Sequence, residues 1–73
     1  MAVKIPIKTE FIKLDQLLKL AGAAETGGHA KEMIQDGEVL VDGVVCLQRG
    51  RKMRPGMAAS VQGEDYEVVA SED

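Results

Sequence analysis

Apolar side chains near the N-terminus change from a spacing of two residues to a spacing of three and four. Val3, Ile5 and Ile7 alternate with other residues, as in a strand that buries one face. Pro6 lies inside this run and restricts the strand to a sheet edge, because proline has no N–H to donate. The spacing then becomes helical at Phe11, Leu14, Leu17, Leu18 and Ala21. The pattern predicts an edge strand and a first helix that ends near Gly22.

The next segment has the pattern of a second helix. Thr26 suits the N-cap position, because its hydroxyl can accept a backbone N–H of the first turn. Ala30, Met33 and Ile34 recur at the spacing of one helical face, and the residues between Ala30 and Met33 are charged. Gly37 follows where a left-handed residue can end a helix without a Cβ clash. We therefore expect a short amphipathic helix between Thr26 and Gly37.

A hairpin and two further strands are predicted after this helix. Val39 and Val41 alternate as in a strand, and Asp42-Gly43 suits a two-residue turn in which both positions need positive φ. Val44 to Leu47 is the predicted returning strand. The later apolar positions that predict strands are Ala59, Val61, Tyr66 and Val68. Residues 70–73 form a tail that we expect to be frayed.

Size and composition indicate one small domain. A chain of 73 residues buries only about 60% of its unfolded surface, which leaves little room for a deep catalytic cavity. Cys46 is the only cysteine, which excludes an intramolecular disulfide and favours a reducing compartment. The longest apolar run, Val44 to Leu47, is far shorter than the roughly 20 residues of a membrane span. We expect a single domain over residues 1–73, a cytoplasmic location, no membrane partner and a monomer.

Charge is segregated along the chain, although the net charge is −3. All nine Lys and Arg residues lie between Lys4 and Arg54, and the remainder of the chain contains five acids and no base. The densest basic segment is the loop 48–54, in which Arg49, Arg51, Lys52 and Arg54 follow one another with no acid. An arginine fork can bind two phosphate oxygens, so the loop suits phosphate contact. The alternative is a solvated loop that keeps a small protein soluble.

Two glycines open the second helix. Gly27 and Gly28 are poor helix formers, each costing on the order of 1 kcal/mol relative to alanine. Without side chains there, a phosphate could approach the free N–H groups and the positive helix end. Alternatively, the glycines let two short helices pack closely. The residues alone leave both explanations open.

Catalytic chemistry has little support. The only histidine and the only cysteine are His29 and Cys46. Cys46 lies in an apolar run, which favours a buried, inert thiol. His29 lies in the first turn of the second helix, where it is better placed to donate to a backbone group or a phosphate than to act as a base. The acids lack the spacing of metal ligands, so we expect no enzyme, no metal and no cofactor.

Over residues 13–56 the chain resembles the RNA-binding domain named after ribosomal protein S-four, also called the alpha-L motif. The matching residues are Lys13-Leu14-Asp15, Leu18, Ala30-Lys31, Met33-Ile34, Gly37, Val39, Val41, Gly43 and Pro55-Gly56. The match is best to free-standing bacterial members, in which the domain is the whole protein. The resemblance implies an α+β fold of two short helices packed on a small, mostly antiparallel sheet. It also implies non-catalytic binding to structured RNA, often ribosomal RNA.

The resemblance also implies a binding surface. Carried over to this chain, it comprises Lys13, Thr26, Gly27, His29, Lys31, Arg49, Arg51 and Lys52, to which the basic loop adds Arg54. Helix two and the basic loop would then flank one groove. Three positions depart from the family pattern: Asp42 replaces the usual asparagine, Met57 replaces aspartate, and Gly27-Gly28 replaces a segment that often carries arginine. We expect affinity to depend more strongly on the basic loop as a result.

Two functions follow from these patterns. The first is RNA binding, with a preference for folded RNA over single strands because aromatic residues are scarce. The second is a protein-interaction adaptor that uses the hairpin edge or the acidic C-terminal surface, which contains Glu64, Asp65 and Glu67. The overall acidic charge motivates this second hypothesis.

Overall fold

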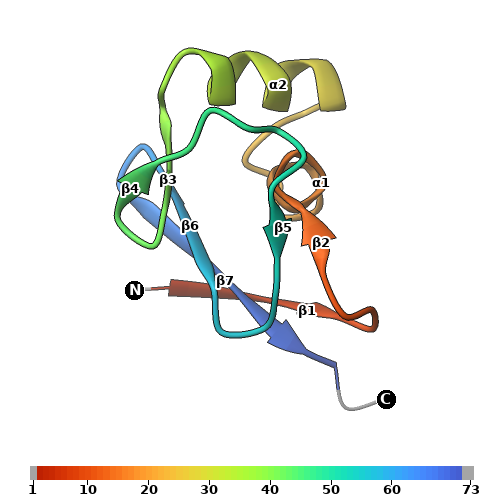
Figure 1. Cartoon of the computed structure of the whole chain (residues 1–73). Helices are drawn as coiled ribbons and strands as arrows, with labels where there is room; N and C mark the ends of the chain where they lie inside the picture. The colour runs from red at the N-terminus through yellow and green to blue at the C-terminus, as the bar shows by residue number, and fades with distance from the viewer. Residues whose placement is uncertain (1, 72–73) are drawn as a thin grey trace.

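The computed structural model describes residues 2–71 and contains, within that range, two helices and seven strands (Figure 1). The helices are α1 (Leu14–Leu20) and α2 (Gly27–Gln35). The strands are β1 (Ala2–Ile7), β2 (Ile12–Lys13), β3 (Val39–Val41), β4 (Val44–Val45), β5 (Lys52–Met53), β6 (Ala58–Val61) and β7 (Glu64–Ala70).

Five strands form one sheet in the order β1-β7-β6-β3-β4. Its neighbouring strands are antiparallel except for β1 and β7, which run parallel. β1 lies at an edge, as Pro6 predicted, because a central strand would need the N–H that proline lacks. With two short helices over a mostly antiparallel sheet, the α+β class is confirmed.

One face of the large sheet is covered by the helices. Burial alternates along β6, where Ala59 and Val61 are buried and their neighbours are partly exposed. The helices α1 and α2 pack against each other on that side (Figure 1). The buried side chains form one cluster: Ile5, Ile7, Leu14, Leu17, Leu18, Ala24, Ala30, Met33, Ile34, Val39, Val41, Cys46, Met53, Ala59, Val61 and Val68. These side chains are aliphatic apart from Met33, Met53 and Cys46, in keeping with the scarcity of aromatic residues in the sequence.

The first helix begins later than predicted. Phe11 was expected to start its apolar stripe, but α1 begins at Leu14, and Lys13 is its extended N-cap residue with φ −71° and ψ 146°. The prediction was wrong because Phe11 matches a helical spacing to Leu14 only by coincidence. The helix ends as expected, with Ala21 as the C-cap and Gly22 at a φ of +79°.

The two residues before α1 form an unpredicted second sheet. β2 pairs antiparallel with β5, with Ile12 opposite Met53 and Lys13 opposite Lys52. We call this pair of strands and its flanking residues Phe11 and Arg54 the ribbon. The predicted basic loop 48–54 is therefore a loop only up to Arg51, because its last part is a strand anchored by the fully buried Met53.

The hairpin turn is confirmed, and the returning strand is shorter than predicted. Asp42 and Gly43 have φ values of +49° and +86°, as a primed two-residue turn requires. The Asp42 carboxylate also accepts the backbone N–H of Ala58 at 3.1 Å. β4 ends at Val45 instead of Leu47. The Cys46 N–H still donates to the Val39 carbonyl at 3.0 Å, and the chain then leaves the sheet (Figure 1).

The C-terminal tail is ordered further than expected. Ala70 pairs with Ile7 in the parallel ladder, and the Ser71 N–H donates to the Ile7 carbonyl at 2.8 Å. The prediction of fraying from residue 70 was therefore wrong for these two positions. The rest of the predicted tail, residues 72–73, lies outside the described residues.

Candidate functional site

The outward face of the ribbon concentrates positive charge. Side chains alternate between the two faces of a strand, so Ile12 and Met53 point towards the core. Lys13 and Lys52 point the other way and are exposed. Phe11 and Arg54 flank this pair on the same face, and their side chains contact each other. The face therefore presents three cations and one aromatic ring without an acid among them.

Lys13 and Lys52 lie directly opposite each other, an arrangement that costs stability. Like charges at opposed positions of an antiparallel pair repel. Lys13 is also the N-cap residue of α1, where its side chain makes no capping hydrogen bond and its charge opposes the helix dipole. No carboxylate in residues 2–71 forms an ion pair with either lysine. Two unfavourable placements at one position indicate a role other than stability.

The backbone of the basic loop performs the capping that Lys13 does not. The Arg51 carbonyl accepts the N–H of Leu14 at 2.9 Å, and the Arg49 carbonyl accepts the N–H of Asp15 at 3.1 Å. These bonds satisfy first-turn donors of α1. The loop is thereby held against α1, while the side chains of Arg49 and Arg51 remain exposed.

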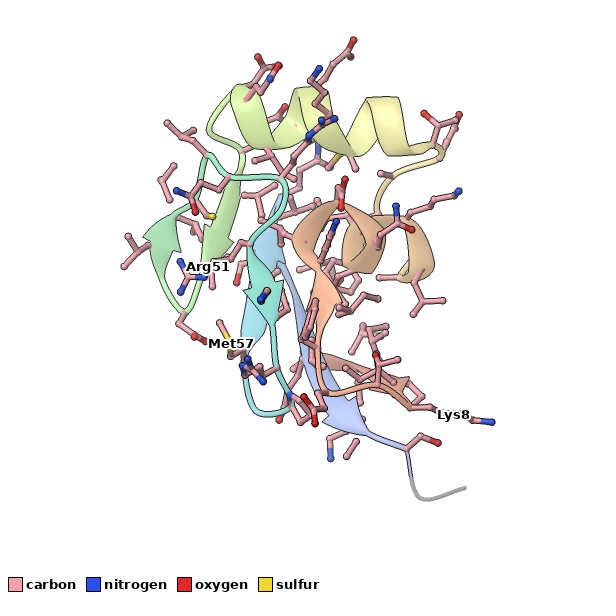
Figure 2. The ribbon with its side chains drawn as sticks, turned by 45° about the vertical axis from the view of Figure 1, so that its right-hand side comes forward. Lys8, Arg51 and Met57 are labelled. Carbon is pink, nitrogen blue, oxygen red and sulfur yellow. The ribbon has the colours of Figure 1, made fainter. Side chains whose placement is uncertain are left out.

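Arg51 points to a part of the surface different from the outward face of the ribbon. It lines a hollow of about 590 Å³ together with residues of the β3–β4 hairpin and the segment that follows it, and no α2 residue lines this hollow. Figure 2 shows the Arg51 side chain on the side of that hairpin. The rim includes Val44, Val45 and Leu47, which are 69%, 51% and 61% exposed. The groove expected between helix two and the loop is not this hollow and stays a prediction.

The start of α2 is capped from within. Thr26 Oγ1 accepts the N–H of His29 at 3.0 Å, as predicted for an N-cap. The His29 Nδ1 atom accepts the N–H of Glu25 at 3.2 Å, which requires the tautomer that carries its proton on Nε2. His29 is exposed, so its Nε2–H is available to an acceptor outside the protein. Lys31, another predicted site residue of α2, is half-buried.

The two glycines of α2 are not explained by close packing. A Cβ added at Gly27 would meet nothing within 4 Å, and at Gly28 only Thr26 Oγ1 at 3.8 Å. Neither glycine has a positive φ. The suggestion that they let the helices pack tightly is therefore wrong. Their positions leave the first turn of α2 open to an approaching group.

Two acidic residues of β7, Asp65 and Glu67, lie on the other face of the large sheet. Val68 points into the core, so Asp65 and Glu67 do not share its side of β7. The ribbon packs on the core side through Met53. The cations of the ribbon and these two carboxylates therefore lie on different sides of the large sheet.

Met57 preserves a turn beside the ribbon without adding a charge. Its Sδ accepts the N–H of Arg54 at 3.3 Å, and its own N–H donates to the Arg54 carbonyl at 2.9 Å. Gly56 supplies the positive φ of +98° that this turn needs. An aspartate at position 57 could accept the same N–H but would place a carboxylate next to Arg54. The departure at Met57 therefore leaves the cations unneutralised.

The histidine and the cysteine of the chain lie apart. Cys46 is buried, and its Sγ contacts the Gln48 carbonyl at 3.7 Å, whereas His29 bonds Glu25, so the two do not pair. No group of three or more His, Cys, Asp and Glu residues between residues 2 and 71 could hold a metal ion. Neither of the two helices is long and apolar enough to cross a membrane.

The structure brings some of the predicted residues together and leaves others apart. Lys13, Lys52 and Arg54 share the ribbon, and Thr26 and His29 share the cap of α2. Within residues 2–71, no hydrogen bond or ring contact joins these two groups. Phe11, which lies under Lys52 and Arg54, was not among the predicted site residues. The available signal was Met53, an apolar residue between two bases, which is typical of an alternating strand.

Comparison with known proteins identifies the family. The family model described as the S4 domain matches residues 5–69. The chain belongs to this family. It is 43% identical over 70 residues, covering 94% of this chain and 99% of the other, to a Bacillus subtilis protein called probable ribosome maturation protein RlbA. It is 40% identical over 63 residues, covering 86% of this chain and 90% of the other, to the putative RNA-binding protein YbcJ of Escherichia coli.

A solved structure supports the same assignment. The solution structure of Escherichia coli YbcJ, described as an alpha-L motif involved in RNA binding, matches this S4 domain with a TM-score of 0.73 and 35% sequence identity. The match covers 96% of this chain and 90% of the other. The resemblance to the alpha-L family seen in the sequence is thereby confirmed.

Proposed function

We propose that this S4 domain binds structured RNA without catalysing a reaction, with the outward face of the ribbon at the centre of the binding surface. The observation that carries the proposal is the unpaired juxtaposition of Lys13 and Lys52, with Arg54 beside them. Cations held close together against their mutual repulsion gain stability when phosphates neutralise them. Family membership and the names of the relatives agree with this role.

The proposed surface extends from the ribbon along the loop. Arg49 continues the positive charge where the loop is held against α1, and Arg51 adds charge on the side of the β3–β4 hairpin. The open first turn of α2 adds N–H donors at Gly27 and Gly28. Such a surface recognises the shape and phosphates of folded RNA more than its sequence. Thr26, His29 and Lys31 complete it on the α2 side.

We further propose ribosomal RNA as the target, and the cytoplasm as the location, because the Bacillus subtilis relative is named as a probable ribosome maturation protein. The domain would act as a monomer. The edge strands give little opportunity for sheet extension between copies, since β4 has two residues and β1 contains Pro6.

Crosslinking in a bacterial lysate tests the proposal. We expect the wild-type protein to recover a defined structured RNA, and a variant with Lys13, Lys52 and Arg54 replaced by alanine to recover only background RNA. With the purified RNA, contact with about four phosphates predicts a slope of about −3 in a plot of log affinity against log salt concentration. A salt-independent affinity, or a co-purifying protein with equal background RNA from both forms, would favour the adaptor hypothesis instead.

The open start of α2 gives a second prediction. Gly27→Ala is expected to leave the free energy of unfolding unchanged or raise it by up to about 0.5 kcal/mol, because alanine is the better helix former and its Cβ meets open space. RNA affinity is expected to fall several-fold, because the methyl group separates the phosphate from the helix N–H groups. Chemical unfolding and RNA titration of the same preparation measure both effects. Unchanged affinity would show that no phosphate approaches the first-turn N–H groups of α2.

A further inference from the structure

Phe11 is placed unlike the other aromatic residue of the chain. Tyr66 packs against the core cluster, whereas Phe11 is half-buried and is not among the side chains packed on that cluster. Its ring is covered instead by the ends of two flexible basic side chains. Lys52 Nζ lies 4.9 Å from the ring centroid and Arg54 Cζ lies 5.8 Å from it.

The Phe11 ring therefore lies at the surface beneath two basic side chains that can move away from it. Cations over a ring face are held weakly at an exposed site, so Lys52 and Arg54 can leave it when a phosphate attracts them. The position of the ring is better defined, because the adjacent Ile12 pairs with the fully buried Met53 and Lys13 is the N-cap residue of α1. A ring exposed in this way offers a flat apolar surface surrounded by phosphate-binding groups.

We propose that Phe11 stacks on one unpaired nucleobase of the bound RNA while Lys13, Lys52 and Arg54 hold the neighbouring phosphates. This inference rests on the proposed RNA binding and specifies its substrate class: a folded RNA with an unstacked nucleotide at a bulge, loop or end. A base inside a continuous duplex is already stacked on both faces and cannot reach the ring. With Phe11 as the single stacking ring, the domain would select one unpaired base within a folded RNA instead of a long single strand.

Two RNA hairpins that differ only in one bulged adenosine provide the test, with a third that has an abasic site at the bulge. Stacking of one base predicts about tenfold tighter binding of the wild-type protein to the bulged hairpin than to the paired one. The abasic hairpin is expected to bind like the paired one. A 2-aminopurine at the bulge reports stacking directly, because its fluorescence falls when the base lies against an aromatic ring.

Phe11→Leu is expected to abolish the tenfold preference and the fluorescence change, so that the bulged hairpin binds no more tightly than the paired one. Phe11→Tyr, which keeps a ring of the same size, is the matched control and should retain both. Because the ring is not packed on the core, neither variant is expected to unfold, and unfolding curves verify this. Equal affinity of the wild type for bulged and paired hairpins, or an unchanged preference in Phe11→Leu, would overturn the inference.

Failure of the proposed RNA binding would give a different result from failure of the stacking role alone. If the wild type bound none of the hairpins at any salt concentration tested and also recovered no RNA above background from the lysate, RNA binding itself and the role of Phe11 would both be excluded. If it bound all three equally, and alanine at Lys13 and Lys52 weakened all three equally, RNA binding would stand and only the stacking role would be lost.

Discussion

Replacing Lys13 and Lys52 together by alanine is expected to weaken RNA binding about thirtyfold, since each lost phosphate contact removes about 1 kcal/mol. The slope of log affinity against log salt should become shallower by about 1.5 to 2. The same change is expected to raise the free energy of unfolding by roughly 0.2 to 1 kcal/mol, because a directly opposed like-charge pair disappears. RNA titrations at several salt concentrations and urea unfolding measure the two effects.

The matched control replaces Lys4 and Lys8 by alanine and so removes the same net charge from β1 and the residue after it. Lys4 lies opposite Glu67, and Figure 2 shows the Lys8 side chain pointing away from the rest of the molecule, on the side opposite Arg51. This variant is expected to lose less than about threefold in affinity, since distant exposed charges are screened. Equal losses in the two variants would mean that the overall field, and not the ribbon, binds the RNA.

Met53→Ala is expected to destabilise the domain by about 3 kcal/mol, because Met53 is fully buried and truncation leaves a cavity. A domain of this size has a stability of only about 3–5 kcal/mol, so a large fraction of the variant would be unfolded. RNA binding should fall with it, because Met53 fixes β5 to the core and thereby positions Lys52 and Arg54. Thermal unfolding by circular dichroism, followed by RNA titration, measures both losses.

Met53→Leu is the control for this prediction. It keeps the buried volume and should cost less than about 1.5 kcal/mol while retaining RNA affinity. Wild-type stability in Met53→Ala would show that the ribbon is not anchored through this side chain. Comparison of the lysine double variants with the Met53 variants distinguishes two causes of weaker binding. The Lys13 and Lys52 variant loses affinity in a stable fold, whereas Met53→Ala loses affinity because the domain unfolds.

Local patterns account for the parts of the fold that were predicted well. The helix from Thr26 to Gly37 has a capping hydroxyl, an apolar stripe and a left-handed stop, all within a dozen residues. Asp42-Gly43 is equally self-contained, because positive φ at two consecutive positions depends on those residues alone. The edge position of β1 followed from the missing N–H of Pro6.

Features that depend on distant residues were missed. β2 and β5 each contain two residues, which is too short for a periodic signal, and Phe11 fits a helical spacing by coincidence. For the candidate site, the sequence indicated all four bases of the segment from Arg49 to Arg54. It could not indicate that Lys13 opposes Lys52, or that Arg51 turns towards the hairpin.

The sequence by itself determined the second helix, the hairpin turn, the aliphatic core and the separation of basic from acidic segments, because each of these depends on neighbouring residues or on composition. Only the tertiary structure decided which cations meet and that Phe11 lies beneath two of them. The pairing of β2 with β5 joins segments separated by both helices and a hairpin. It is set by backbone hydrogen bonds and by burial of Met53, and neither leaves a local pattern at Lys13.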